Sequence, residues 1–258
     1  MTKTYIELWL WLIITAPVLL VLQNWISRHT QTVFLLLTRH SGMAILLNQV
    51  VFLPGVVLHE MSHWIMARLL GVRTMGVSVW PKRQNDGSLR LGYVHTNKVD
   101  FVRESLIGVA PLIFGCAAVA TIGRELLDLD GVGVALLRGD LFNGFLNVLH
   151  VFRSTDLFIW GYVVFALSNT MMPSSSDRRA WPVVGILVIA LGLVLYYVGM
   201  PAIIQTTLSN VIIDGVRVIA TAFTVTIGVD VVVIPVLYGI EWLLWQFVPD
   251  DRLKFSIK

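Results

Sequence analysis

Apolar runs long enough to cross a lipid bilayer recur along this chain, and they constrain its fold more than any other feature. Hydrophobic residues make up 56% of the sequence and charged residues 14%, whereas about a quarter of a soluble domain is charged. A helix of about 20 mostly apolar residues spans a membrane. The sequence therefore predicts an all-α polytopic membrane protein with about six transmembrane helices. The predicted spans are 5–22, 43–70, 105–123, 157–172, 183–199 and 216–248.

The segments between these spans are less regular. We expect short interfacial helices within 23–41 and around 139–152, because charged and apolar residues alternate there. Whether 202–248 forms one or two membrane elements stays open. No internal repeat or low-complexity linker interrupts the chain, so we predict a single membrane-embedded domain over 1–258, with its core at 43–182.

The motif His59-Glu60-Met61-Ser62-His63 lies inside the second predicted span. Residues i and i+4 share one face of a helix, so both imidazoles can bind one metal ion. Glu60 is next to the first ligand and can activate a metal-bound water, which is the arrangement of zinc proteases. Two core histidines beside a chance glutamate are the alternative. That alternative is disfavoured because ionisable groups at membrane depth are costly without a partner or a function.

One extended polar stretch, 72–104, follows the motif. Apolar and polar residues alternate over 77–80 and again over 89–96, with turn-forming residues between them. This pattern predicts a β-hairpin over 77–96, within a hairpin region of 73–104. The hairpin directly follows the helix with the motif, so it is either part of the mouth of the site or an ordinary connection. The residues leave both possibilities open.

With H-E-x-x-H on a membrane helix, the chain resembles the site-2 protease family of intramembrane zinc metalloproteases. Gly108-Val-Ala-Pro111 is similar to the family's small-residue Gly-Pro segment. The stretch from Asn169 to Asp177 looks like the family's loop that contains Asn and Pro and ends in a metal-binding aspartate. The resemblance covers roughly 50–182.

This resemblance implies one Zn²⁺ ion held by His59, His63 and Asp177. It also implies that Glu60 activates the zinc-bound water and that Asn169 hydrogen-bonds the substrate backbone or the developing oxyanion. A helix-end cap or an interhelical hydrogen bond is the alternative role of Asn169. The implied activity is hydrolysis of peptide bonds within or near transmembrane helices of single-pass membrane proteins.

Two other functions are compatible with the residues. A non-catalytic membrane scaffold or regulator that retains the metalloprotease fold is suggested by the unusual run Ser174-Ser-Ser-Asp-Arg-Arg179. A transporter with a metal site at its midplane is disfavoured, because the sequence lacks repeat symmetry.

A nucleic-acid partner is not expected, because no dense basic stripe is present. Neither the substrate nor the oligomeric state is indicated.

The distribution of Lys and Arg predicts the orientation. If the hairpin is cytoplasmic and there are six spans, both termini are cytoplasmic and most basic residues lie inside, among them Arg73, Lys82 and Arg178. This agrees with the positive-inside rule. We therefore expect a multi-pass protein of a prokaryotic cell membrane, with its active site near the cytoplasmic side.

Overall fold

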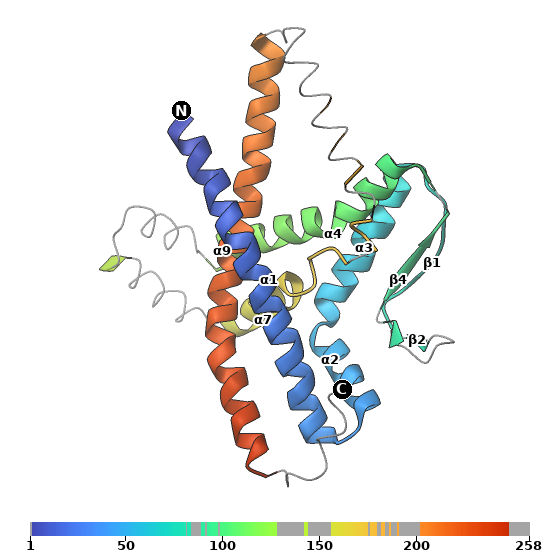
Figure 1. Cartoon of the computed structure of the whole chain (residues 1–258), viewed down its shortest axis with the longest axis vertical. Coiled ribbons are helices and arrows are strands. Elements are labelled where there is room, and N and C mark those ends of the chain that lie inside the picture. The colour runs from blue at the N-terminus through green and yellow to red at the C-terminus, as the bar shows by residue number, and fades with distance from the viewer. Residues whose placement is uncertain are drawn as a thin grey trace.

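Helices dominate the part of the chain that the structure describes (Figure 1). The computed structural model describes residues 2–80, 82–83, 89–90, 92–97, 99–127, 142–143, 156–174, 176–179, 182–183, 186, 190 and 202–247. Three helices in these ranges are long and apolar enough to cross a membrane, and a bent helix pair provides a fourth candidate span. The architecture therefore fits a polytopic helical membrane protein. The predicted span 183–199 and the predicted interfacial helix around 139–152 lie almost entirely outside the described residues.

Helix α1 (Thr2–Thr38) is continuous over 37 residues. The prediction of a span ending at residue 22, followed by a separate interfacial helix, is therefore wrong. Two of the polar side chains after residue 22 are buried rather than placed at an interface: Gln23 and Thr30 are 8% and 7% exposed. The Gln23 amide donates to the Ser168 carbonyl at 2.7 Å, so a distant backbone group satisfies it inside the protein.

Helix α9 (Ala202–Trp245) is a single helix of 44 residues, which answers the question left open for 202–248. It packs along α1, and the two run in the same direction (Figure 1). Trp11 of α1 donates to the Thr224 hydroxyl near the middle of α9 at 2.9 Å, and further along both helices His29 pairs with Glu241. The start of α1 and the end of α9 therefore lie at opposite ends of the bundle. Six spans with both termini on one side would require the two helices to run in opposite directions.

The motif lies on the second arm of a bent helix pair, α2 (Ser41–Val51) and α3 (Leu53–Leu69). The sequence predicts one helix over 43–70 with a bend at Pro54-Gly55, and the structure has two helices whose arms meet at 73°. Pro54 explains the break, because a proline ring clashes with the preceding turn in a helix interior but is accepted in the first turn. Gly71 ends α3 as predicted: its φ is +70°, and the Val72 N–H donates to the Ala67 carbonyl at 2.8 Å.

Two short antiparallel strand pairs follow α3. Strand β1 (Thr74–Ser78) pairs with β4 (Tyr93–Thr96), and β2 (Lys82–Arg83) pairs with β3 (Leu89–Arg90). The first strand starts at Thr74, three residues before the expected start at 77. Both β1 and β4 contact α3, and Figure 1 shows them extending beside that helix.

Helix α4 (Phe101–Thr121) continues into a π-helical turn, η1 (Ile122–Leu126), and helix α7 (Leu157–Ser168) lies further along the chain. Helix α4 begins four residues before the predicted start, because the Asp100 carboxylate accepts from the Val102 and Arg103 N–H groups and caps it. Twelve residues give α7 a length of about 18 Å, well short of a hydrocarbon core of about 30 Å.

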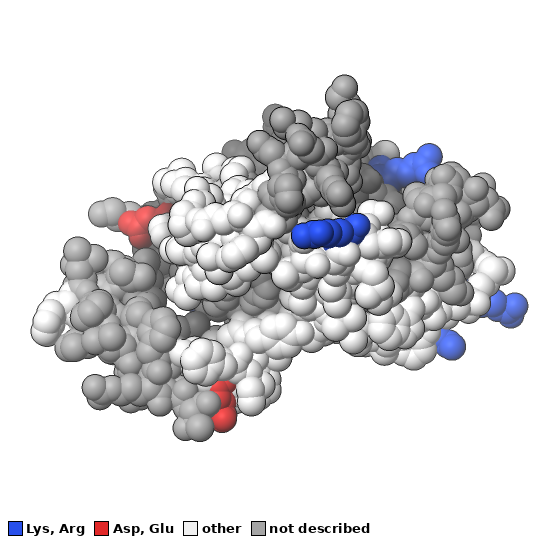
Figure 2. All heavy atoms as spheres, turned by 90° about the horizontal axis from the view of Figure 1, so that it is seen from below, with Lys and Arg blue, Asp and Glu red and all other residues white. Residues whose placement is uncertain are grey.

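The core lies where α1, α4, α7 and α9 meet. Cys116, a free cysteine, is buried there. Its cluster contains Leu19, Cys116, Val119, Val164, Met171, Ala222 and Phe223 among others. In the view from below in Figure 2, the described residues carry few Lys, Arg, Asp or Glu side chains. Large apolar side chains elsewhere on α1 and α9 face outward. Such a surface suits contact with lipid.

Candidate metal centre

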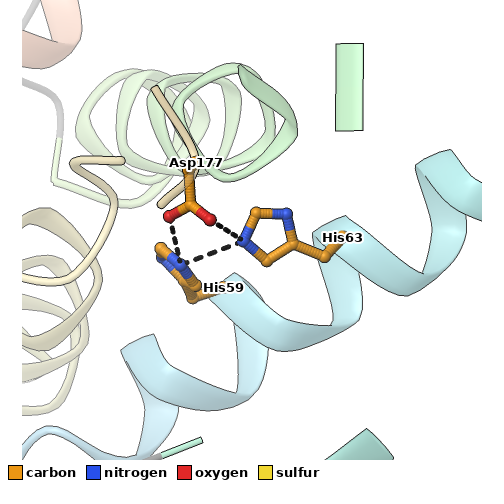
Figure 3. A group of neighbouring side chains, drawn as sticks. All are labelled: His59, His63 and Asp177. Atoms are coloured by element: carbon orange, nitrogen blue, oxygen red, sulfur yellow. Dashed lines mark hydrogen bonds and ion pairs between the residues drawn. The ribbon is translucent and has the colours of Figure 1, made fainter. Parts of the chain in front are cut away.

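Two histidines of α3 and one aspartate beyond α7 meet at a single point (Figure 3). The Nε2 atoms of His59 and His63 lie 3.2 Å apart, one helical turn from each other. The Asp177 carboxylate faces both: Oδ1 is 3.5 Å from His63 Nε2, and Oδ2 is 3.7 Å from His59 Nε2. The structure thus brings together the three side chains expected as metal ligands, although Asp177 is far from the histidines in sequence.

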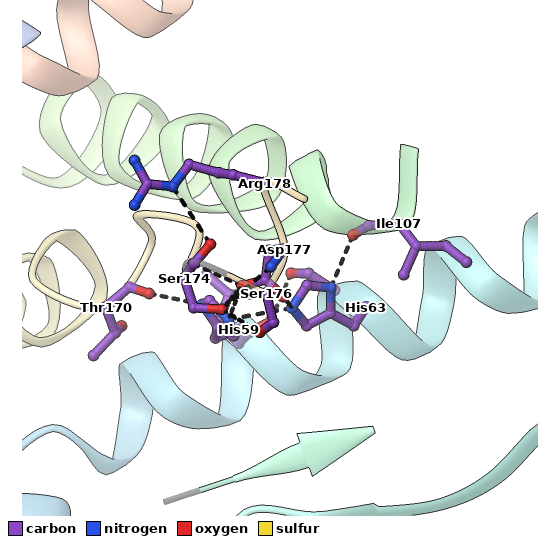
Figure 4. Close-up of polar contacts among 10 residues, drawn as sticks. His59, His63, Ile107, Thr170, Ser174, Ser176, Asp177 and Arg178 are labelled. Carbon is purple, nitrogen blue, oxygen red and sulfur yellow. Dashed lines mark hydrogen bonds and ion pairs between the residues drawn. The ribbon is translucent and has the colours of Figure 1, made fainter. Parts of the chain in front are cut away.

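Backbone carbonyls orient both imidazole rings (Figure 4). His59 Nδ1 lies 2.7 Å from the Thr170 carbonyl oxygen, and His63 Nδ1 lies 2.8 Å from that of Ile107. A carbonyl oxygen can only accept, so each Nδ1 must carry a proton and donate it. In neutral imidazoles this leaves an unshared electron pair on each Nε2, directed at the centre of the cluster, as in metal-ligating histidines.

The donor set fits a zinc ion. Two unprotonated nitrogens and a carboxylate converge here, and such electron-rich groups repel one another unless a cation lies between them. Zinc–ligand bonds of about 2.0 Å in a tetrahedron place neighbouring ligand atoms about 3.3 Å apart. The two Nε2 atoms lie 3.2 Å apart, and the two oxygens of Asp177 lie 3.5 and 3.7 Å from one Nε2 each. With one ligand atom from each residue, the three atoms lie within 4.8 Å of one another, somewhat wider than this tetrahedron. Three protein ligands also leave a fourth position for a reactant, as catalytic zinc sites require.

Ser174 holds Asp177 in place, and the sequence analysis did not identify this residue. Its backbone N–H and its hydroxyl both donate to Asp177 Oδ2, at 2.7 and 2.6 Å. Burial favours the neutral acid, but hydrogen bonds to the carboxylate, the two from Ser174 among them, outweigh it and lower the pKa of Asp177 well below its usual value. The group is therefore a carboxylate at neutral pH. Arg178 donates its Nε–H to the Ser174 carbonyl at 3.4 Å, so it supports the backbone of this segment.

Gly108 allows Asp177 to reach the histidines. A Cβ atom at position 108 would lie 2.1 Å from the Asp177 carbonyl oxygen, which is closer than any side chain permits. The residue before it, Ile107, provides the carbonyl that orients His63. One turn of α4 therefore positions two of the three ligands, and this gives the Gly108-Val-Ala-Pro111 segment a structural role at the site.

Glu60 lies beside the ligands and is nearly buried, with 8% of its surface exposed. The backbone at Gly92, just before β4, passes directly over its carboxylate. A Cβ atom at position 92 would lie 2.5 Å from Glu60 Oε1. The strand region that follows α3 therefore covers the glutamate of the motif, so this part of the chain borders the site.

Asn169 does not join the ligand cluster. Its Nδ2 donates to the Phe165 carbonyl and to Asp230 Oδ1 of α9, both at 3.0 Å. This is an interhelical hydrogen bond, which the sequence analysis named as the alternative to a catalytic role. The partner, Asp230, was not proposed for the site. The sequence feature that could have identified Asp230 is its position as a charged residue inside a long apolar segment.

The chemistry of this cluster is that of a Lewis-acid site with a nearby proton acceptor. The ligands come from α3 and from the segment after α7, and the carboxylate of Glu60 lies next to the first ligand. Such a set can bind a divalent metal ion and activate a water molecule beside it. No family model, curated protein or solved structure matches this chain.

Proposed function

We propose that this protein is an intramembrane zinc metalloprotease, like the site-2 proteases that residues 50–182 resemble. It would hydrolyse peptide bonds within or near the transmembrane helices of single-pass membrane proteins. The observation that carries the proposal is the convergence of His59, His63 and Asp177 beside Glu60. Its apolar helical surroundings support a substrate that arrives through the bilayer.

In this mechanism the two imidazoles and the Asp177 carboxylate would hold the zinc ion. A zinc ion there would supply Lewis acidity toward the scissile carbonyl and the attacking water. Glu60 accepts the proton of the attacking water and then delivers it to the leaving amine. The carbonyls of Thr170 and Ile107 keep the imidazoles oriented throughout.

The segment at Gly92 and β4 is proposed to contact the substrate. Among the described strands, β4 pairs only with β1, and its start lies against Glu60. A strand edge offers backbone hydrogen bonds that do not depend on side-chain identity. A transmembrane helix that unwinds for cleavage needs such partners for its freed amide groups.

Gly92→Ala is expected to slow cleavage at least about 10-fold with zinc retained. The added methyl group would displace the Glu60 carboxylate, and small displacements of a catalytic group cost large factors in rate. Gly76→Ala is the matched control, because a Cβ atom there meets nothing within 4 Å. Cleavage rates and zinc content of both variants provide the measurement. Equal rates for Gly92→Ala and wild type would show that the strand region leaves Glu60 undisturbed.

We further propose that the site lies near the cytoplasmic face of a prokaryotic cell membrane. Arg68 and Arg73 flank the end of α3, and basic residues favour the cytoplasmic side. In Figure 1, α3 rises toward the end of the bundle at which α1 begins. The start of α1 then shares the cytoplasmic side with the site, and the end of α9 lies outside.

Cysteine labelling tests this orientation. In a Cys116→Ala background, cysteines at Lys3 and Met75 should react from the cytoplasmic side, and a cysteine at Gln246 only from outside. This follows from the parallel packing of α1 and α9. Labelling at Lys3 and Gln246 from the same side would contradict it and favour the six-span arrangement.

The function itself is tested by zinc analysis of the purified protein together with Glu60→Gln, scored on candidate single-pass substrates. A scaffold or regulator that retains the fold would bind metal without cleaving any of them. The expected results are argued in the Discussion.

A further inference from the structure

Asp230 is a fully buried carboxylate in the longest helix of the protein. Its exposed fraction is 0%, and it accepts a hydrogen bond from Asn169 Nδ2 at 3.0 Å. The bond connects α9 to the residue that directly follows α7. No part of the proposed mechanism uses Asp230, so its position calls for a separate explanation.

The bond reaches the metal ligands through a single turn of the chain. Asn169 immediately precedes Thr170, whose carbonyl accepts the Nδ1 proton of His59. The Thr170 hydroxyl donates to the Ala166 carbonyl at 2.9 Å. On the other side the turn packs against α3, since a Cβ atom at Gly55 would lie 2.1 Å from the Thr170 hydroxyl oxygen. The turn is thus held between α9 and α3, and a shift of Asn169 would move the group that orients His59.

Stability does not account for this pair. Asp230 Oδ2 and Asn169 Oδ1 are buried and accept no hydrogen bond from the described residues. Buried polar atoms without partners cost free energy, and an ionisable residue in an apolar membrane helix costs more. Replacing both members of a buried polar pair by apolar residues is often neutral or stabilising. An apolar pair at positions 169 and 230 would therefore suit the fold at least as well.

We propose that Asp230 is a positioning residue for the metal centre. It holds Asn169, and through Asn169 it fixes the Thr170 carbonyl that sets the orientation of the His59 imidazole. The inference rests on the proposed function, because it assumes that His59 binds a metal. It gives α9 a role in positioning the site. It also gives Asn169 a role at the site that does not require contact with the substrate.

Cobalt(II) in place of zinc tests the proposal, because the visible absorption of cobalt depends on how its ligands are arranged. Zinc is a d¹⁰ ion and has no visible absorption of this kind. Asp230→Leu should weaken cobalt binding about 10-fold, as loss of a partner behind a ligand commonly does, and should shift the absorption bands. Its thermal unfolding midpoint should stay close to that of the wild type, because Asn169 Nδ2 keeps the Phe165 carbonyl as an acceptor. Asp230→Asn keeps an oxygen that can accept from Asn169, so it should retain the affinity and the spectrum. Asp214→Leu is the matched control on the same helix, because that side chain is 70% exposed.

An Asp230→Leu protein with wild-type cobalt affinity and spectrum would overturn the proposal. Equal losses in Asp230→Asn and Asp230→Leu would also overturn it, since the accepting oxygen would then not be what matters. His59→Ala separates this failure from failure of the proposed function. If wild type binds cobalt no better than His59→Ala does, the metal centre itself is wrong, and the role of Asp230 is wrong with it.

Discussion

Glu60→Gln is expected to abolish cleavage while the purified protein keeps its zinc. The change removes only the proton acceptor, because the metal ligands are His59, His63 and Asp177. General acid–base catalysis contributes about 10²- to 10⁴-fold, so cleavage of a single-pass substrate should fall by at least about 100-fold. Zinc content, measured on the same preparation, should be unchanged. The nearly buried carboxylate lies against Gly92, and an amide of the same shape fits there equally well.

Glu104→Gln is the matched control for this experiment. Glu104 is an exposed glutamate on α4, outside the ligand cluster, so its loss should leave both zinc and cleavage intact. Cleavage by Glu60→Gln at the wild-type rate would rule out the protease mechanism. A wild-type protein that binds zinc but cleaves none of the single-pass substrates would favour the scaffold or regulator.

Asp177→Ala should weaken zinc binding by at least about 10-fold and should reduce cleavage with it. Loss of a residue that merely supports a ligand already costs 10- to 100-fold in affinity, and Asp177 is a proposed ligand. Asp177→Asn should impair binding too, because a neutral amide is a poorer zinc ligand than the carboxylate to which Ser174 donates. Zinc affinity, measured by competition with a chelator of known affinity, checks both variants.

Arg178→Ala is the neighbouring control. The Arg178 side chain donates to the Ser174 carbonyl and not to the carboxylate, so its removal should leave zinc in place. Wild-type zinc binding and cleavage by Asp177→Ala would mean that the third ligand is elsewhere. The resemblance of the 169–177 segment would then be misleading.

The local features of this protein could be predicted from sequence because neighbouring residues determine them. The shared face of His59 and His63 follows from the period of an α-helix. The end of α3 at Gly71 follows from the conformational freedom of glycine. The membrane character follows from apolar runs, which need no knowledge of packing.

The pairing of distant segments could not be predicted in the same way. Polar residues after position 22 indicated an interface, but Gln23 is buried because Ser168 offers it a carbonyl. The bond between Asn169 and Asp230 likewise joins two segments that no local pattern connects. Whether a polar group in an apolar chain faces water or a buried partner depends on which groups the fold brings beside it.

The sequence by itself therefore determined the apolar helical character, the break at Pro54 and the paired histidines of one helix face. Only the tertiary structure decided that α1 and α9 run parallel and that Ser174 and Gly108 hold Asp177 against the histidines. The reason is physical. Helix periodicity and turn chemistry act over a few residues, whereas close packing and burial of polar groups depend on contacts between segments far apart in the chain.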